Sequence, residues 1–167
     1  MSTLFPRPIA HRGLHDRSKG VIENSRSAFA AALEQGYAIE CDVQLSSDGV
    51  PFIFHDDEFD RLTEATGRSD ARPIAEVKTL TLKGSSSGDV PPLFTEFLDQ
   101  VGGRTQLQIE LKQQKDAAGT RALAATVAAA LKGYTGPYTI ESFDPNLLMA
   151  MRREGIAAPP GIITYGY

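Results

Sequence analysis

Segments in which apolar and polar residues alternate recur along the chain. In "AIECDVQL" (38–45) every second residue is apolar, and "TQLQIELK" (105–112) shows the same alternation, so both predict strands with two different faces. Four further short apolar runs predict strands at residues 8–12, 51–57, 138–143 and 161–165. We therefore expect six strands.

Helical periodicity fills the longer segments between these strands. It predicts helices at residues 25–36, 93–103, 118–134 and 144–155. In the third of these, Leu123, Val127 and Leu131 follow one another at intervals of four, which is typical of an amphipathic helix. The fourth has Asp144 as its N-cap and Pro145 at its first helical position. Strands that alternate with helices predict βα units and a parallel sheet.

Composition narrows the class of protein. A length of 167 residues fits one domain, and 41% apolar with 23% charged residues is ordinary for a globular protein. The net charge of −4 offers no basic surface for nucleic acid or an anionic membrane. No apolar run approaches the ~20 residues that span a bilayer, so we expect no stable membrane insertion.

Two further features bear on location and on metal ligands. The first residues, "MSTLFPRPIAHRG", lack the long apolar stretch of a signal peptide, so a cytoplasmic location is expected. The single cysteine, Cys41, excludes an internal disulfide and a thiolate zinc cluster. Any metal would need oxygen or imidazole ligands.

Acidic and basic side chains occupy strand positions where a core would hold aliphatic residues. Glu40 and Asp42 share one face of their strand, and Glu110 and Lys112 share one face of theirs. His55 is predicted near the end of the strand at 51–57. Carboxylates gathered at the carboxyl ends of parallel strands would repel one another, and a hard cation such as Mg²⁺ or Ca²⁺ would neutralise them. Solvated strand ends and a structural histidine are the alternative that this pattern leaves open.

Several short motifs occur in a specific order and spacing. They are "AHRG" (10–13), "ENS" (23–25), "ECDVQLSSDGVPFIFHDDEFDRLT" (40–63), "IELK" (109–112) and "SF" (142–143). Together they closely resemble the glycerophosphodiester phosphodiesterase family, and the resemblance extends from about residue 7 to the end of the chain. It implies an α/β fold of the (β/α)8 TIM-barrel type, with about six βα units present here.

The resemblance also implies roles for particular residues. The implied metal ligands are Glu40, Asp42 and Glu110, with Mg²⁺ or Ca²⁺ as cofactor. The implied acid–base pair is His11 and His55, and Arg12 and Lys112 would hold phosphate oxygens. Glu23 would be a supporting carboxylate or an additional site. By contrast, Asp56 is expected to cap or to hydrogen-bond nearby backbone.

The implied reaction is the metal-dependent hydrolysis of a small-molecule glycerophosphodiester to glycerol 3-phosphate and an alcohol. A glycerol hydroxyl would attack phosphorus to give a cyclic phosphate, which water then opens. Two alternatives stay open at this point. One is a related barrel phospholipase or cyclising phosphodiesterase that acts on lipid headgroups, and the other is a non-catalytic remnant that binds a phosphodiester.

Length is where the sequence departs from the family pattern. A complete barrel of this type typically has ~250 residues. We therefore expect residues 1–167 to form a single glycerophosphodiester phosphodiesterase-like barrel domain that is incomplete at its C-terminal side. The open edge of such a sheet would favour self-association.

Overall fold

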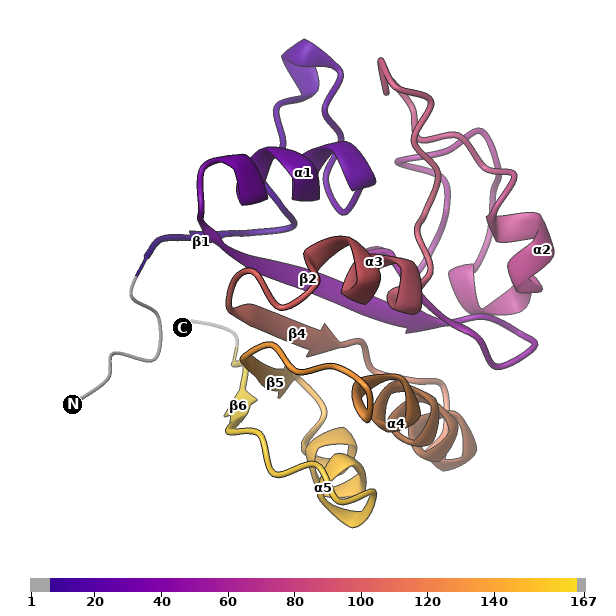
Figure 1. Cartoon of the computed structure of the whole chain (residues 1–167). Helices are drawn as coiled ribbons and strands as arrows, with labels where there is room; N and C mark the ends of the chain where they lie inside the picture. Colours follow the sequence, from indigo (N-terminus) through magenta and orange to yellow (C-terminus); the bar gives the residue numbers. More distant parts are fainter. Residues whose placement is uncertain (1–6, 165–167) are drawn as a thin grey trace.

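A computed structural model describes residues 7–164, which form one six-stranded sheet with helices packed along one face (Figure 1). Five strands are parallel, in the order β1 (Ile9–Ala10), β2 (Ala38–Leu45), β4 (Leu107–Leu111), β5 (Tyr138–Ser142) and β6 (Pro160–Ile162). The expected number of strands and the α/β class are confirmed.

The remaining strand, β3 (Pro51–Ile53), departs from the expected pattern because it pairs with β2 in the antiparallel direction. A parallel crossover needs about a dozen residues or more, and only residues 46–50 separate the two strands. The segment 51–57 is therefore not one long barrel strand. The described chain has five parallel strands, and β3 is the sixth strand of the sheet, which runs in the opposite direction.

Four longer helices follow the strands where periodicity predicted them. They are α1 (Arg26–Glu34), α3 (Phe94–Val101), α4 (Ala117–Leu131) and α5 (Pro145–Arg153). Short helical turns η1 (Arg17–Lys19), η2 (Ser69–Ala71) and α2 (Ile74–Val77) lie in the connections. The Ser25 and Asp144 side chains cap α1 and α5, because each accepts a hydrogen bond from a backbone N–H of the first turn.

The apolar face of the sheet meets the helices and forms the main core. Ile39 and Cys41 of β2 and Ile109 of β4 are fully buried against them. Phe29 of α1 and Phe97 of α3 pack on each other with their ring centroids 4.5 Å apart. Because neighbouring residues of a strand point to opposite faces, the intervening polar residues of β2 and β4 project from the other side of the sheet.

A second apolar cluster fixes the long connection between β3 and α3. It contains Ile22, Phe52, Phe54, Phe59, Leu62, Val77 and Leu82, all buried. Figure 1 shows this connection beyond the carboxyl end of β2. The polar side chains of residues 55–61 are thereby held close to the strand ends.

The sheet is open in the part of the chain that the structure describes. β1 and β6 lie at the two ends of the strand order, and 64% of Ile162 in β6 is exposed. Among residues 7–164, no helix is both long enough and apolar enough to cross a membrane.

The loop after β1 packs tightly on α1, and Gly13 makes this approach possible. Gly13 has φ +79°, and a Cβ placed there would lie 2.8 Å from the Cβ of Ala28. The Leu14 N–H donates to the Ala28 carbonyl at 3.0 Å. A side chain at position 13 would therefore push His11 and Arg12, which immediately precede it, away from the sheet.

Replacing Gly13 with alanine is expected to lower the free energy of unfolding by roughly 2–4 kcal/mol, because left-handed backbone and the collision with Ala28 both oppose the methyl group. Gly49→Ala is the matched control, since Gly49 has φ +80° and no atom within 4 Å of the added Cβ. The control should lose only about 1–2 kcal/mol. Urea unfolding measures both values, and equal losses would contradict the close packing of Gly13.

Candidate active site

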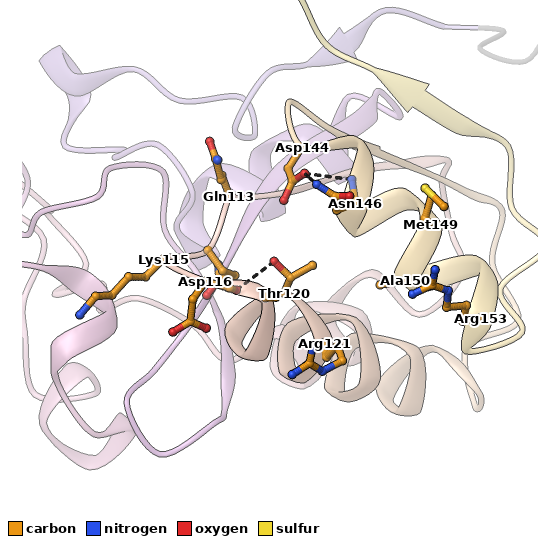
Figure 2. A pocket seen from close by; sticks show the side chains of 12 residues that line it. Gln113, Lys115, Asp116, Thr120, Arg121, Asp144, Asn146, Met149, Ala150 and Arg153 are labelled. Atoms are coloured by element: carbon orange, nitrogen blue, oxygen red, sulfur yellow. Dashed lines mark hydrogen bonds between the residues drawn. The ribbon is translucent and has the colours of Figure 1, made fainter.

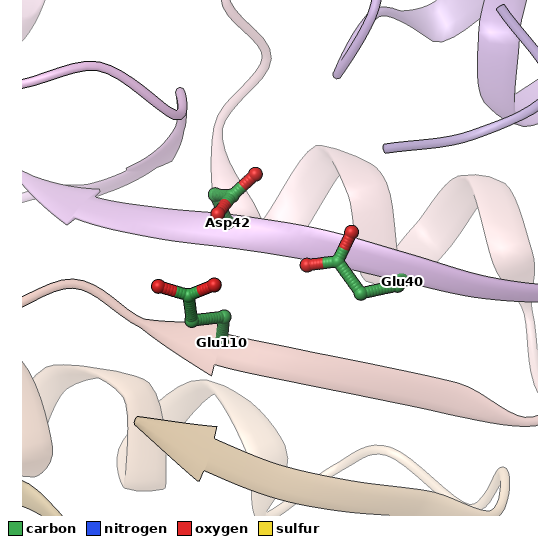
Figure 3. Close-up of side chains that lie close together, drawn as sticks. All are labelled: Glu40, Asp42 and Glu110. Atoms are coloured by element: carbon green, nitrogen blue, oxygen red, sulfur yellow. The ribbon is translucent and has the colours of Figure 1, made fainter. Parts of the chain in front are cut away.

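Three carboxylates converge on the polar face of the sheet. Glu40 and Asp42 come from β2 and Glu110 from β4, and Figure 3 shows their carboxylates turned toward one another. Asp42 and Glu110 are direct partners in the parallel register. One carboxylate oxygen from each residue lies within 4.8 Å of the other two. All three residues are buried, with exposed fractions of 4%, 1% and 8%.

This cluster carries more negative charge than its surroundings neutralise. Burial and the nearby Asp42 carboxylate raise the pKa of Glu40 to about 8, although the Arg12 N–H donates to Glu40 Oε2 at 2.8 Å. Burial also raises the pKa of Glu110, against the opposing hydrogen bond from Lys112. A divalent cation held among these carboxylates would favour their ionised forms and lower both pKa values.

Lys112 projects into the cluster from the end of β4. Its Nζ donates to Glu110 Oε1 at 2.8 Å and to Asp42 Oδ1 at 3.3 Å. Burial alone would lower the pKa of this ammonium, but the charge of Asp42 and the contact with Glu110 outweigh burial and raise it. Lys112 therefore stays charged beside the two carboxylates.

Two residues of the loop after β1 reach the cluster through left-handed backbone. Arg12 has φ 58° and Asn24 has φ 53°, and the Asn24 N–H donates to the Arg12 carbonyl at 2.8 Å. Asn24 Nδ2 donates to Asp42 Oδ2 at 2.8 Å, and only 2% of Asn24 is exposed. From the sequence, Asn24 was included only as part of the "ENS" motif at residues 23–25. Its buried contact with Asp42 depends on tertiary structure, although asparagine is one of the few residues that tolerate such a φ.

Glu23 lies beside the carboxylate cluster and pairs with arginines. Its Oε1 accepts from Arg12 Nη1 at 2.9 Å, and both of its oxygens accept from Arg61. Burial opposes ionisation, but these hydrogen bonds lower the pKa of Glu23 to about 2. Among the described residues, the acidic cluster that could hold a metal consists of Glu40, Asp42 and Glu110. The position of Glu23 therefore suits a supporting role.

The two predicted histidines lie close to this cluster. His11 Nε2 is 3.9 Å from Glu40 Oε2, and 70% of the His11 side chain is exposed. Partial desolvation and the Arg12 guanidinium lower the pKa of His11, and His55 lowers it further. His55 follows β3 by two residues, so it lies on a loop rather than on the strand that the sequence predicted.

His55 is oriented by its neighbour Asp56, with 2.7 Å between His55 Nδ1 and Asp56 Oδ1. Burial opposes ionisation of Asp56, but hydrogen bonds from Arg61 and His55 lower its pKa. An ionised carboxylate only accepts hydrogen bonds, so His55 Nδ1 must be the donor. The Nε2 atom of the neutral ring then carries the free lone pair. Asp56 thus bonds to a catalytic candidate, and the expectation that it only caps or bonds backbone was incomplete.

A hollow of about 400 Å³ opens beside these groups. It is lined by His55, Asp56, Asp57, Glu110, Lys112, Gln113 and Phe143. Phe143, from the "SF" motif, is therefore part of its wall. The hollow brings a histidine, a lysine and one carboxylate of the cluster to a shared surface, so several polar groups converge on it.

Another hollow of about 420 Å³ lies between α4 and α5 (Figure 2). Its acidic residues are occupied by structural roles. Asp116 caps α4, and Asp144 caps α5 while also accepting from Asn146 Nδ2. None of the sequence-predicted site residues lines this hollow.

The carboxylate cluster fits a hard divalent cation. It offers three buried oxygen donors, and Mg²⁺ and Ca²⁺ both prefer oxygen ligands. The structure brings together seven predicted residues around this point, namely His11, Arg12, Glu40, Asp42, His55, Glu110 and Lys112. Their catalytic and binding roles stay predictions. Sequence reasoning missed Asn24 and Arg61 among the residues that contact this group.

Comparison with known sequences bears on this arrangement. The sequence model of the Glycerophosphoryl diester phosphodiesterase family matches residues 11–163. A glycerophosphodiester phosphodiesterase of Caldanaerobacter subterraneus subsp. tengcongensis is 36% identical over 110 residues. That match covers 62% of this chain and 44% of the relative.

Solved structures give the same result. A phosphodiesterase of Oleispira antarctica, in complex with the product sn-glycerol-3-phosphate, has a TM-score of 0.82 at 28% identity, covering 95% of this chain and 66% of that one. A glycerophosphodiester phosphodiesterase of Agrobacterium tumefaciens has a TM-score of 0.77 at 28% identity, covering 92% and 65%. The chain thus spans less than two thirds of the length of these relatives. The structural similarity confirms the predicted TIM-barrel fold class. The chain belongs to the glycerophosphoryl diester phosphodiesterase family.

Proposed function

We propose that this chain hydrolyses small glycerophosphodiesters to glycerol 3-phosphate and an alcohol, with a divalent cation held by Glu40, Asp42 and Glu110. The observation that carries the proposal is the buried carboxylate cluster with a histidine at each side. The product bound in the Oleispira antarctica relative supports the same class of substrate. Both Mg²⁺ and Ca²⁺ suit the three carboxylates.

Positive charge at the site would bind and polarise the phosphodiester. Arg12 Nε is buried, has no hydrogen-bond acceptor among the described residues, and lies 3.5 Å from Asp42 Oδ2. The guanidinium of Arg12 would hold one phosphate oxygen, and the ammonium of Lys112 would hold a second. When bound, the cation would supply further charge to offset the negative charge that develops on phosphate. Such stabilisation is a large part of phosphoryl-group chemistry.

The two imidazoles would move the protons. A hydroxyl that attacks phosphorus must lose its proton, and the departing alkoxide must gain one. His55 suits the first step, because its Nδ1–H bonds to Asp56 and its Nε2 lone pair is free. His11, exposed beside Glu40, would protonate the leaving alcohol. Attack by the glycerol hydroxyl would give a cyclic phosphate, which water opens with the proton roles reversed.

The match to the curated relative covers less than half of that protein, which bears on the proposed activity. The chain spans 44% of the Caldanaerobacter relative, so an activity of the whole relative is extended here to a shorter chain. A C-terminally incomplete barrel, self-association through the open edge and a cytoplasmic location stay predictions. A phosphodiester-binding unit without turnover is the result that the catalytic proposal must exclude.

Release of glycerol 3-phosphate from glycerophosphocholine by the 167-residue chain tests the proposal directly. We expect turnover that EDTA abolishes and that Mg²⁺ or Ca²⁺ restores. A chain that is folded and binds the cation but releases no product would contradict catalysis and leave ligand binding as the function. Turnover that persists in EDTA would contradict the role of the cation.

His55→Ala is expected to lower kcat by about 10²–10⁴-fold, because the variant lacks the imidazole that accepts the proton. His15→Ala is the matched control, since His15 is exposed and outside the site. Unfolding by urea and cation affinity should change little in either variant. Unchanged turnover in His55→Ala would exclude His55 from the reaction.

The free energy of unfolding should depend on pH in the absence of cation. The pKa of Glu40 is about 8 in the folded chain against about 4.5 in an unfolded one, so the folded state binds more protons between these values. The contribution of Glu40 to the free energy of unfolding is then fully present below pH ~4.5 and is lost, by an amount on the order of a few kcal/mol, as pH rises toward ~8. Saturating Mg²⁺ or Ca²⁺ should reverse the loss.

Urea unfolding from pH 5 to 8.5 measures this dependence. Glu40→Gln keeps the side chain's shape but cannot ionise, so most of the slope should disappear. The exposed residue Glu34 provides a control, because Glu34→Gln should keep the wild-type slope. If Glu40→Gln kept the wild-type pH dependence of the free energy of unfolding, a group other than Glu40 would be responsible for it.

A further inference from the structure

Arg61 connects the two acidic groups that flank the site. Its Nε and Nη2 donate to the two oxygens of Asp56 at 2.6 and 2.9 Å. Its Nη1 and Nη2 donate to the two oxygens of Glu23 at 2.8 and 2.7 Å. One guanidinium therefore holds two carboxylates through four hydrogen bonds, with both oxygens of each carboxylate engaged.

Both carboxylates bear on residues that would act on the substrate. Asp56 Oδ1 is the partner of His55 Nδ1 at 2.7 Å, and Glu23 Oε1 is the partner of Arg12 Nη1 at 2.9 Å. Arg61 itself lines none of the hollow beside His55. Its effect on the reaction must therefore pass through Asp56 and Glu23.

The backbone around Arg61 is rigidly supported. Phe59 and Leu62, on either side of it, are 0% and 1% exposed within the second apolar cluster. The Thr63 N–H donates to the Phe59 carbonyl at 2.9 Å, and the Lys83 N–H donates to the Leu62 carbonyl at 2.7 Å. The Arg61 side chain is 44% exposed, and solvent at this exposure would weaken a single ion pair. The planar guanidinium on a fixed backbone nevertheless selects one geometry for its hydrogen bonds.

Asp56 is held from its other side by the sheet. Gln44 of β2, which is 3% exposed, donates through Nε2 to the Asp56 carbonyl at 3.2 Å. The Phe54 N–H donates to the Asp42 carbonyl at 3.0 Å. With its backbone fixed by β2, the direction of the Asp56 carboxylate is set by the guanidinium of Arg61.

We infer that Arg61 is a positioning residue of the reaction under "Proposed function", on which this inference rests. By holding the Asp56 carboxylate ionised and in plane, it keeps the proton of His55 on Nδ1 and leaves Nε2 as the base. Arg61 also binds the Glu23 carboxylate, so the negative charge of Glu23 is divided between two guanidinium groups. Arg12 then keeps more of its positive charge for the substrate.

The state of the His55 ring gives a test that does not depend on turnover. The chain has three histidines, so ring ¹⁵N spectra can be assigned with His11→Gln and His15→Gln. At pH ~8.5, where an ordinary imidazole is neutral, wild type should show His55 protonated on Nδ1. Arg61→Leu should shift the signal toward the Nε2-protonated form. Asp56→Asn should give the same shift.

Arg68→Leu is the matched control. Arg68 lies in the same connection and donates to both oxygens of Asp70 at 2.8 and 2.6 Å, without contacting the site. It should leave the His55 ring signals unchanged. Arg61→Lys should give an intermediate shift, because an ammonium keeps the charge but cannot fork onto two carboxylates. If Arg61→Leu does not fold, the His55 ring signals of Arg61→Lys provide the test.

Kinetics separate the role of Arg61 from a merely structural one. With glycerophosphocholine and saturating Mg²⁺, Arg61→Leu should lower kcat roughly 10- to 100-fold, and Arg61→Lys should restore part of the loss. An unchanged His55 tautomer in Arg61→Leu would overturn the inference, even with reduced turnover. A wild-type chain without turnover but with the expected tautomer shift would overturn the proposed function and leave the positioning role intact.

Discussion

The electrostatic repulsion among three carboxylates is the constraint on which the site depends. Parallel pairing of β2 with β4 sets Asp42 beside Glu110, and alternation along β2 adds Glu40 on the same face. Burial to a few per cent exposure removes most of the water that would screen them. Such a cluster is stable only with protons, ammonium or guanidinium groups, or a metal ion nearby.

The surrounding basic residues offset this repulsion in two layers. Lys112 and Arg12 stand directly against the carboxylates of the cluster. Farther out, Arg61 meets the carboxylates of Glu23 and Asp56. The inner layer leaves negative charge in surplus, as the high pKa of Glu40 indicates, whereas the outer layer holds its groups ionised. This division is compatible with a divalent cation at the centre of a fixed frame of ion pairs.

Much of the fold was predictable because it depends on local pattern. Alternation gave β2 and β4, and capping residues such as Asp144 gave the helix starts. The direction of β3 was missed because alternation is the same in parallel and antiparallel strands. The length of the connection at 46–50 was the available signal, since it is too short for a crossover.

The site was predictable as far as motifs extend. Residues two positions apart in a strand point to the same face, so the shared face of Glu40 and Asp42 could be predicted from the sequence alone. Arg61 was not recognised, because its partner Glu23 is 38 residues away and is reached only through the packing of Phe59 and Leu62. A contact of this kind is set by tertiary structure and has no local signature.

Calorimetric titration of Mg²⁺ or Ca²⁺ in buffers of different ionisation enthalpy tests the central claim most directly. If Glu40 is protonated in the free chain at pH 7 and becomes a ligand, binding one cation should release about one proton, and Glu40→Gln should abolish that release. Cation binding without proton release, or no binding by the folded chain, would contradict the account.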